Sequence, residues 1–395
     1  MSRNVFQSGR ALLCRWWAVE ALSPGTVPEL SQNIVMEKGT SKMHSRDRVI
    51  AAVAFKSPDR IPIQVHSSPG GLFEHGQKLL DLIRACPCDF GDRLGVTLPQ
   101  PPGEDFDPDG SYHRVATDPW GTTWEYRIFG IWGHPHRLPL VDLGALATYK
   151  PPMPPPLSGP GFEEAKKHIA KHKEKYFFTG GGGMIWEQMH FLRPYEDCLV
   201  DIMEDTPEIN SLADIITAYA EGCVLHNLAA GADAIQFGDD FGTQQAPIFP
   251  LAVWRRFFKP RYERLCAPIR KAGKKILFHS CGQIAPLLED FAELGVNAIW
   301  PQLPLFDPHE LAHRCRSLGL AVLLHPDRGD LMQRGKPQDV RDYIPRLLDT
   351  FDTASGGSWL YLEIDPGFKW ENVQALFECA ISLRGGCGQV LAGGK

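Results

Sequence analysis

Short apolar runs alternate with longer segments of helical periodicity along most of this chain. The runs have the length of buried strands, and the longer segments carry apolar residues at the spacing of amphipathic helices. Strands that alternate with helices in this way pair in parallel, because each crossover needs a helix-sized connection. The expected strands are 61–66, 176–179, 234–238, 275–279, 298–300, 321–324 and 358–362, and the expected helices are 162–173, 195–203, 207–230, 250–272, 284–294, 307–318, 337–353 and 370–383.

About seven or eight such units in roughly 350 residues favour a closed (β/α)8 TIM barrel over an open sheet. In that fold the reactive groups lie at the carboxyl ends of the strands. Polar positions follow the expected strands repeatedly here, so we expect them to converge on one mouth of the barrel. These positions are His66, the glycines 180–183, Asp239, Asp240, His279, Cys281, Gln302, Asp327, Arg328, Glu363 and Asp365.

The segment before this alternation is less regular. Helices are expected at 46–55 and 76–85, and the alternation with a glycine turn at 117–126 predicts antiparallel strands. Residues 151–160 are typical of a polyproline-type linker. Residues 1–42 carry no secretory h-region. We expect them to be a disordered tail or an extension upstream of a true start at Met43, with one barrel domain at 43–395.

Composition narrows the class of protein. The net charge of -6 argues against a nucleic-acid or anionic-membrane surface. No apolar run approaches the roughly 20 residues that span a bilayer. The ten cysteines are scattered without the spacing of a disulfide framework, which favours a reducing, cytoplasmic setting.

The pair His279 and Cys281 is the first candidate for chemistry. Two residues apart in extended backbone, their side chains leave the same face of a strand. Imidazole nitrogen and thiolate sulfur are ligands that zinc prefers, and Gly282 then permits a tight turn. The alternative for such a short motif is a packed histidine beside an inert buried cysteine.

The adjacent carboxylates Asp239 and Asp240 are the candidate catalytic residues. Two neighbouring carboxylates cannot both be buried without partners. At least one should therefore face the cavity as a base, a metal ligand or an acceptor for substrate. The alternative is that one of them caps a helix at the strand-to-helix turn.

Several other polar positions are candidates for binding a substrate. Glycines 180–183 precede Trp186 and Glu187 and would permit close approach of the backbone to a ligand. Arg328, which follows Asp327, could bind a substrate carboxylate or form an internal Asp–Arg salt bridge. Gln302 could bind substrate or shape its loop. The expected substrate-binding set is His66, Trp186, Glu187, Gln244, Gln302, Asp327 and Arg328.

From Met43 to about Arg384 the chain resembles the uroporphyrinogen decarboxylase superfamily, which includes zinc-dependent cobamide methyltransferases acting on thiols. The resemblance implies a (β/α)8 barrel. The matching segments are Ser-Arg-Asp-Arg-Val at 45–49, Pro-Asp-Arg-Ile-Pro at 58–62, Asp-Pro-Trp-Gly at 118–121 with Trp124 and Glu125, Gly-Ala-Asp-Ala at 231–234, Gly-Asp-Asp-Phe-Gly-Thr-Gln at 238–244, Phe-Phe-Lys-Pro-Arg-Tyr at 257–262, His-Ser-Cys-Gly at 279–282 and Trp-Glu-Asn-Val at 370–373.

The resemblance favours the methyltransferase branch. True decarboxylases of the family carry an Arg-Gln-Ala-Gly-Arg-Tyr segment whose arginines grip the porphyrinogen acids, and residues 64–70 here contain no arginine. The methyltransferase branch uses a His-x-Cys pair and a distant cysteine near the last strand. Glu363 is the nearest group at that position, so the implied zinc set is His279, Cys281 and Glu363.

The function implied is methyl transfer between a corrinoid, carried by a partner protein, and a thiol or related acceptor. Zinc would hold the acceptor as a thiolate, with Asp239 or Asp240 orienting it or taking its proton. Two alternatives remain. One is a metal-independent decarboxylase of a smaller acid, and the other is a corrinoid- or tetrapyrrole-binding module without catalysis. Proteins of this family often dimerise, so a homodimer is a further expectation.

Overall fold

The computed structural model describes residues 43–383, so the expected N-terminal extension lies outside the described residues. Its centre is a sheet in which all hydrogen-bonded neighbours run parallel. In spatial order the strands are β1 (Ile63–Val65), β10 (Ser358–Leu362), β9 (Ala321–Leu324), β8 (Ala298–Pro301), β7 (Lys275–Ser280), β6 (Ala234–Gly238) and β5 (Thr179–Gly183).

An irregular segment closes the ring between the edge strands β1 and β5. The backbone N–H of Asp89 donates to the carbonyl of Ile63 at 2.8 Å, and the N–H of Phe177 donates to the carbonyl of Asp89 at 3.4 Å. The guanidinium of Arg93 donates to the carbonyl of Val65 at 3.1 Å. This segment takes the place of an eighth strand, so the expected (β/α)8 barrel is confirmed with seven regular strands in the described part of the chain.

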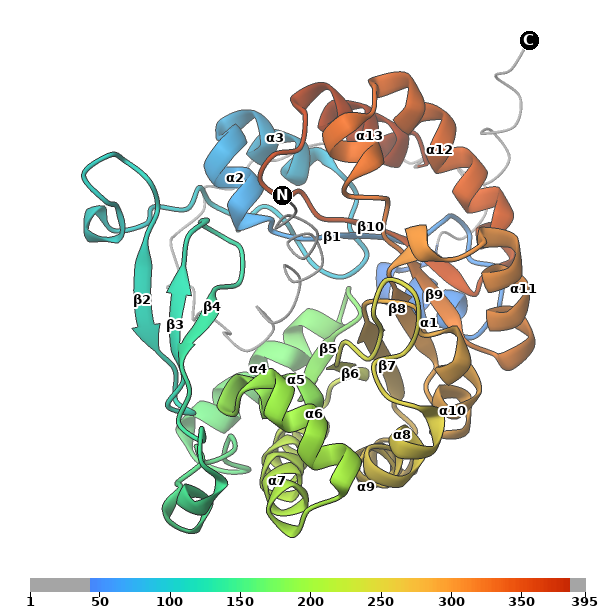
Figure 1. Ribbon diagram of the computed structural model, residues 1–395. Coiled ribbons are helices and arrows are strands. Elements are labelled where there is room, and N and C mark those ends of the chain that lie inside the picture. Colours follow the sequence, from blue (N-terminus) through green and yellow to red (C-terminus); the bar gives the residue numbers. More distant parts are fainter. Residues whose placement is uncertain (1–42, 384–395) are drawn as a thin grey trace.

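Helices surround the sheet on its outer side (Figure 1). Thr206 begins the longest of them by accepting a hydrogen bond from the N–H of Ile209, as an N-cap does. The helices are α1 (Ser45–Val53), α2 (Pro69–His75), α3 (Gln77–Ala85), α4 (Pro160–Lys173), α5 (Trp186–Leu192), α6 (Tyr195–Glu204), α7 (Pro207–Ala230), α8 (Leu251–Phe257), α9 (Lys259–Lys271), α10 (Leu288–Glu293), α11 (Pro308–Leu318), α12 (Pro337–Thr350) and α13 (Trp370–Ser382).

Successive side chains along each strand point to opposite faces of the sheet, so the core has two layers. In β6, Ile235 and Phe237 belong to the outer layer that packs on the helices, whereas Ala234 belongs to an inner layer. The inner layer also contains Val49 and Val53 of α1, so this helix plugs the end of the barrel where the strands begin. Residues in phase with Ala234 therefore face the barrel interior, and the carboxyl ends of the strands are left for the site.

A small antiparallel sheet stands beside the barrel (Figure 1). It consists of β2 (Arg114–Thr117), β3 (Thr123–Tyr126) and β4 (His134–Arg137) in that order. The antiparallel strands expected around 117–126 are thus confirmed. Trp124 is buried with Phe191 of α5, and the hydroxyl of Thr122 donates to the carbonyl of Phe191 at 2.6 Å, which anchors the sheet to the barrel.

The four glycines expected at a strand tip lie inside β5 instead. A Cβ atom at Gly180 would lie 2.5 Å from the Cγ of Asn227, and one at Gly182 would overlap the ring of Phe237. These glycines therefore let the strand pack closely on α7 and β6, and the tip begins after them.

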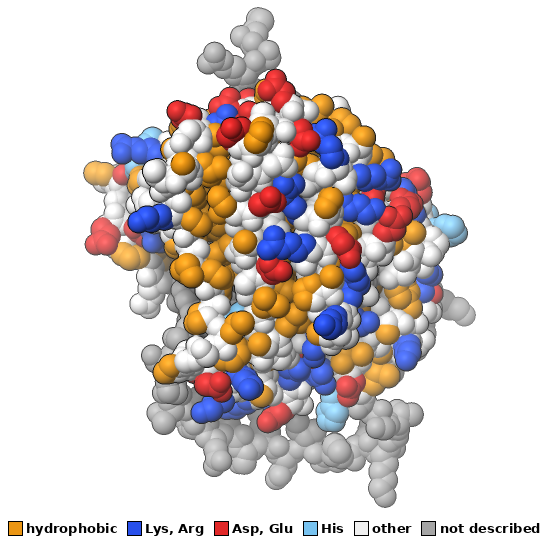
Figure 2. All heavy atoms as spheres, turned by 90° about the horizontal axis from the view of Figure 1, so that it is seen from below, with side chains coloured by type: hydrophobic (Ala, Val, Ile, Leu, Met, Phe, Trp, Pro, Cys, Tyr) orange, Lys and Arg blue, Asp and Glu red, His pale blue; other side chains and the backbone are white. Residues whose placement is uncertain are grey.

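The face of the molecule seen in Figure 2 shows no field of a single sign. On the face seen in Figure 2, acidic and basic side chains are interspersed, with hydrophobic side chains in patches between them. Within residues 43–383, no helix combines the length and apolar character needed to cross a bilayer.

Candidate metal centre

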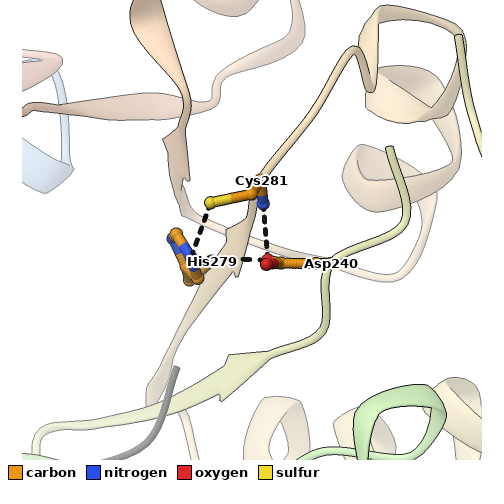
Figure 3. A group of neighbouring side chains, drawn as sticks. All are labelled: Asp240, His279 and Cys281. Carbon is orange, nitrogen blue, oxygen red and sulfur yellow. Dashed lines mark hydrogen bonds and ion pairs between the residues drawn. The ribbon is translucent and has the colours of Figure 1, made fainter. Parts of the chain in front are cut away.

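Asp240, His279 and Cys281 form a compact group at the carboxyl ends of β6 and β7 (Figure 3). The Nε2 atom of His279 lies 3.5 Å from the Sγ of Cys281 and 3.5 Å from an Oδ1 of Asp240. Tetrahedral zinc with bonds of about 2.0–2.3 Å places such ligand atoms roughly 3.3–3.6 Å apart. His279 thus already stands from both neighbours at the separation that a small tetrahedral cation requires, and all three ligand atoms lie within 4.8 Å of one another.

The imidazole of His279 is held in the form that binds metals. Its Nδ1 lies 2.9 Å from the carbonyl oxygen of Trp300. A carbonyl only accepts, so Nδ1 carries the proton and Nε2 presents its lone pair to the group. Burial lowers the pKa of His279 to about 4, which keeps the ring neutral near pH 7. A hydrogen bond from the non-ligating nitrogen to a backbone carbonyl is the usual outer support of a metal-binding histidine.

The loops after β6 and β7 are locked together, which fixes Asp240 against Cys281. The N–H of Cys281 donates to the Oδ1 of Asp240 at 2.6 Å, and the N–H of Gly242 donates to the carbonyl of Cys281 at 3.1 Å. Gly282 has φ +84°, and a Cβ there would overlap the backbone of Gly242. The tight turn expected at Gly282 is therefore also a close contact between two backbones.

The electrostatics of the group favour a bound cation. Burial and the charge of Glu187 raise the pKa of Asp240 well above its usual value. Burial and the charge of Asp240 likewise raise the pKa of the Cys281 thiol. Among residues 43–383, no Lys or Arg forms an ion pair with Asp240. A divalent cation would stabilise both ionised ligands at once, because it supplies the opposite charge that these buried groups lack.

Asp239 does not cap a helix at its own strand-to-helix turn, which was the alternative, but binds the start of α5, which follows β5. Its carboxylate accepts hydrogen bonds from the N–H groups of Ile185, Trp186 and Glu187 at 2.7, 2.9 and 2.8 Å, and from the hydroxyl of Tyr262. Burial raises the pKa of Asp239 to about 7, against the opposing effect of these hydrogen bonds.

Strand alternation explains the different roles of the two aspartates. Asp239 is in phase with Phe237 in the outer layer, whereas Asp240 is in phase with Ala234 in the inner layer. Of the two expected catalytic carboxylates, the structure brings only Asp240 to the group.

Glu363 does not join the group, although it was the expected third ligand. It follows β10, three strands away from β7 in the sheet. Its Oε1 lies 3.2 Å from the Nδ1 of His66, and the hydroxyl of Tyr361 lies 3.4 Å from its Oε2. Asp240 stands in the third place instead, because β6 is the direct neighbour of β7.

The structure places some of the expected substrate-binding residues near the Asp240–His279–Cys281 group and others away from it. Glu187 is buried beside Asp240, and its Oε1 lies 3.2 Å from the Nε2 of His190. Gln302 shapes the adjacent loop, since its Oε1 accepts from the N–H of Gly282 at 3.1 Å, and the side-chain amide of Gln244 lies 3.5 Å from the same atom.

Trp186, by contrast, is fully buried within an aromatic cluster that includes Phe249 and Tyr195. Its ring belongs to the outer layer of the core, so the structure does not bring it to the mouth of the barrel.

Of the two arrangements considered for Arg328, the structure shows an internal Asp–Arg salt bridge. The carboxylate of Asp327 accepts from the N–H of Gly329 at 2.8 Å and so shapes the turn. Arg328 pairs with Asp365 rather than with Asp327. Burial lowers the pKa of Arg328, and nearby Glu363 and Cys281 oppose this effect, so the guanidinium faces the barrel mouth.

Three aromatic residues of the inner layer were missed by sequence reasoning. The Trp300 ring lies 4.3 Å from His279 and 4.8 Å from Tyr361, and Tyr361 lies 4.9 Å from His325. These rings connect the metal-ligand group with Glu363 across the mouth. The signal was available, because His325 is two residues beyond Leu323 and Tyr361 two beyond Trp359, both of the inner layer.

The structure thus shows a (β/α)8 barrel with a candidate metal-ligand group at the carboxyl ends of its strands. The family model described as uroporphyrinogen decarboxylase (URO-D) matches residues 137–382, more than half of the chain, and the protein belongs to that family. The comparison with curated proteins gives no match.

The fold is also similar to that of a methyltransferase from Methanosarcina mazei, with 15% sequence identity, a TM-score of 0.55, and coverage of 86% of this chain and 98% of that chain. A dihydropteroate synthase from Xanthomonas albilineans aligns with 18% identity over 50% of this chain and 64% of that chain, but its TM-score is only 0.32.

Proposed function

We propose that this protein is a zinc-dependent methyltransferase that transfers a methyl group between a corrinoid and a thiol or related acceptor. The observation that carries the proposal is the Asp240–His279–Cys281 group, in which a neutral imidazole turns its lone pair toward a thiol and a carboxylate. Membership of the family and the likeness of the fold to a methyltransferase support it.

The three side chains of this group would hold zinc and leave a fourth position for the acceptor. A zinc ion stabilises a bound thiolate near neutral pH. In the reaction, the acceptor sulfur forms a bond to the methyl carbon while the cobalt–carbon bond breaks. Both electrons of that bond stay on cobalt, and the thiol proton leaves.

The residues around the group account for orientation and for the proton. The carbonyl of Trp300 keeps the proton of His279 on Nδ1, away from the acceptor. The Glu187 carboxylate is buried and its charge acts on Asp240, so it can take the proton of the thiol and share it with His190, 3.2 Å away. The aromatic rings of the inner layer limit access of water.

Metal content and methyl transfer test this proposal together. Purified protein should contain about one zinc per chain, and His279→Ala, Cys281→Ser and Asp240→Asn should each lose most of it. Cys379→Ser on α13 and His309→Ala on the surface are matched controls and should keep it. Under anaerobic conditions the unsubstituted chain should demethylate methylcobalamin with a suitable thiol, and the ligand variants should not. Little zinc in the unsubstituted chain, with His279→Ala unchanged, would defeat the proposal.

Decarboxylation of a carboxylated substrate is the second candidate. It is favoured by the partly buried guanidinium of Arg328, which follows β9, pairs with Asp365 and has donors that can also bind a substrate carboxylate. This reaction needs no metal. Release of CO₂ by chelator-treated protein, lost in Arg328→Gln and unaffected in His279→Ala, would favour it over methyl transfer.

A further inference from the structure

Two cavities meet at the irregular seam between β1 and β5, away from the metal-ligand group. The outer cleft, of about 890 Å³, lies between the β2–β4 sheet and residues 95–102. The inner cavity, of about 250 Å³, is lined by His66, Gln64 and Thr179 in the barrel wall. Ser67 and Arg93 line both cavities, so the two spaces adjoin at these residues.

The outer cleft has the size and walls of a small-molecule site. Pockets for such ligands occupy roughly 300–1,000 Å³ and are lined mainly by apolar and aromatic groups with a few polar ones. One wall carries Tyr112, Tyr126, Phe129 and Trp132. The opposite wall, residues 95–102, contains three prolines, which stiffen it. Such walls suit a flat apolar ligand.

Arg93 is the cation where the cleft and the inner cavity meet. It forms no ion pair with a carboxylate in the described part of the chain, and its guanidinium donates to the carbonyls of Val65 and Gly91 at 3.1 and 3.3 Å. A Cβ at Gly91 would overlap the Nη2 of Arg93, so the glycine makes room for the guanidinium. The side chain is thus held by backbone groups, with donors left for a ligand.

The neighbouring charges leave Arg93 as the best anion-binding group. Arg114 also lines the cleft and lies over the ring of Tyr126, 6.0 Å from its centre. Two carboxylates line the cleft as well, and the Oδ1 of Asp92 is occupied by the N–H of Leu94 at 2.8 Å.

We propose that the outer cleft and the inner cavity form one ligand site, in which an elongated molecule places a planar apolar part between the aromatic wall and residues 95–102 and an anionic group on Arg93. The inner end of this site reaches His66, whose ring pairs with Glu363 at the barrel mouth. The site requires no metal, so it stands or falls separately from the proposed function.

Two fluorescent probes of matched shape test the site. One is 8-anilinonaphthalene-1-sulfonate, and the other is N-phenyl-1-naphthylamine, which has the same rings without the sulfonate. The full chain should bind the sulfonate one to one and more tightly than the neutral probe. Arg93→Gln should lower the affinity for the sulfonate probe about tenfold, as expected for a lost charge-assisted hydrogen bond, and leave the affinity for the neutral probe unchanged. Arg93→Lys should restore part of the affinity.

A cavity-filling variant separates binding in the cleft from binding elsewhere. A Cβ at Gly95 meets nothing within 4 Å, and Gly95 lines the cleft, so Gly95→Phe should fold and should block both probes. Gly161→Phe, equally open but outside the cleft, and Arg127→Gln on the adjacent surface are the controls and should bind both probes normally. The proposal is overturned if Arg93→Gln changes both probes equally or neither, or if Gly95→Phe still binds them.

Discussion

The β6–β7 rim and the β1–β5 seam are built in opposite ways. At the rim, two regular strands continue into loops that hydrogen-bond to each other, and three ligand side chains are brought within 4.8 Å. At the seam, an irregular segment replaces a strand and two cavities open beside it. Regular pairing thus concentrates polar groups, whereas its interruption leaves space for a ligand.

The largest effect is expected at the seam, from removal of Asp89. Its fully buried carboxylate accepts from Arg48 at 2.6 Å, from Arg60 at 2.8 Å and from the N–H of Ile63 at 3.0 Å. Asp89→Ala leaves the buried guanidinium of Arg48 and the partly buried one of Arg60 without this partner and should lower the free energy of unfolding by about 3–5 kcal/mol. Urea unfolding measures this, and a loss below about 1 kcal/mol would show that the segment is not held by this carboxylate.

At the rim, Gly282→Ala should lower the free energy of unfolding by about 3 kcal/mol. It should also remove most of the zinc that the proposed function requires. The new Cβ would meet the backbone of Gly242 and the residue would keep a positive φ, so the two loops must separate. Gly273→Ala is the matched control, because its φ is also positive but its Cβ would meet nothing within 4 Å. It should cost about 1 kcal/mol and no zinc. Equal losses in the two variants would contradict the role of the backbone contact.

Substitution of Asp239 should mainly affect stability, whereas substitution of its neighbour Asp240 should mainly affect metal binding. Asp239→Asn weakens three hydrogen bonds that hold the start of α5 and a fourth from the hydroxyl of Tyr262, and it should lower the free energy of unfolding in urea by about 2 kcal/mol. Asp240→Asn should change stability much less but lose zinc. If zinc content falls more in Asp239→Asn than in Asp240→Asn, the assignment of Asp240 to the metal-ligand group is wrong.

The smallest effect concerns Asp233, at the opposite end of β6 from the rim. Burial raises the pKa of Asp233, but hydrogen bonds from Arg46 and Lys173 outweigh this and hold it below its usual value. Because the pKa is lower in the folded state, ionised Asp233 stabilises the protein fully above the unfolded-state pKa of about 4. This stabilisation is lost as the pH falls from that value through the folded-state pKa. Asp233→Asn should therefore lower the free energy of unfolding by about 1–2 kcal/mol at pH 7 and by less at pH 3, with the zinc content unchanged.

The hydrophobic pattern predicted the barrel because the strand–helix alternation is regular from β5 onward. It also placed His279 and Cys281 on one face. It did not reveal which carboxylate would join them, since Glu363 and Asp240 both follow strands and only the sheet order makes β6 the neighbour of β7. The separation of Asp239 from Asp240 was readable from alternation. The seam could not be predicted from the sequence, because no local pattern marks segment 87–93 as part of the sheet.

The hydrogen bond from His279 to the carbonyl of Trp300 has a consequence for how the protein can change. Because the acceptor is a main-chain atom, exchange of the indole for any other side chain leaves the acceptor in place. The pairing of β7 with β8 therefore determines that the imidazole proton lies on Nδ1. Substitutions can therefore reshape the space around the Asp240–His279–Cys281 group while the Nε2 lone pair of His279 stays available, so in the proposed enzyme the acceptor could change without loss of the zinc ligand.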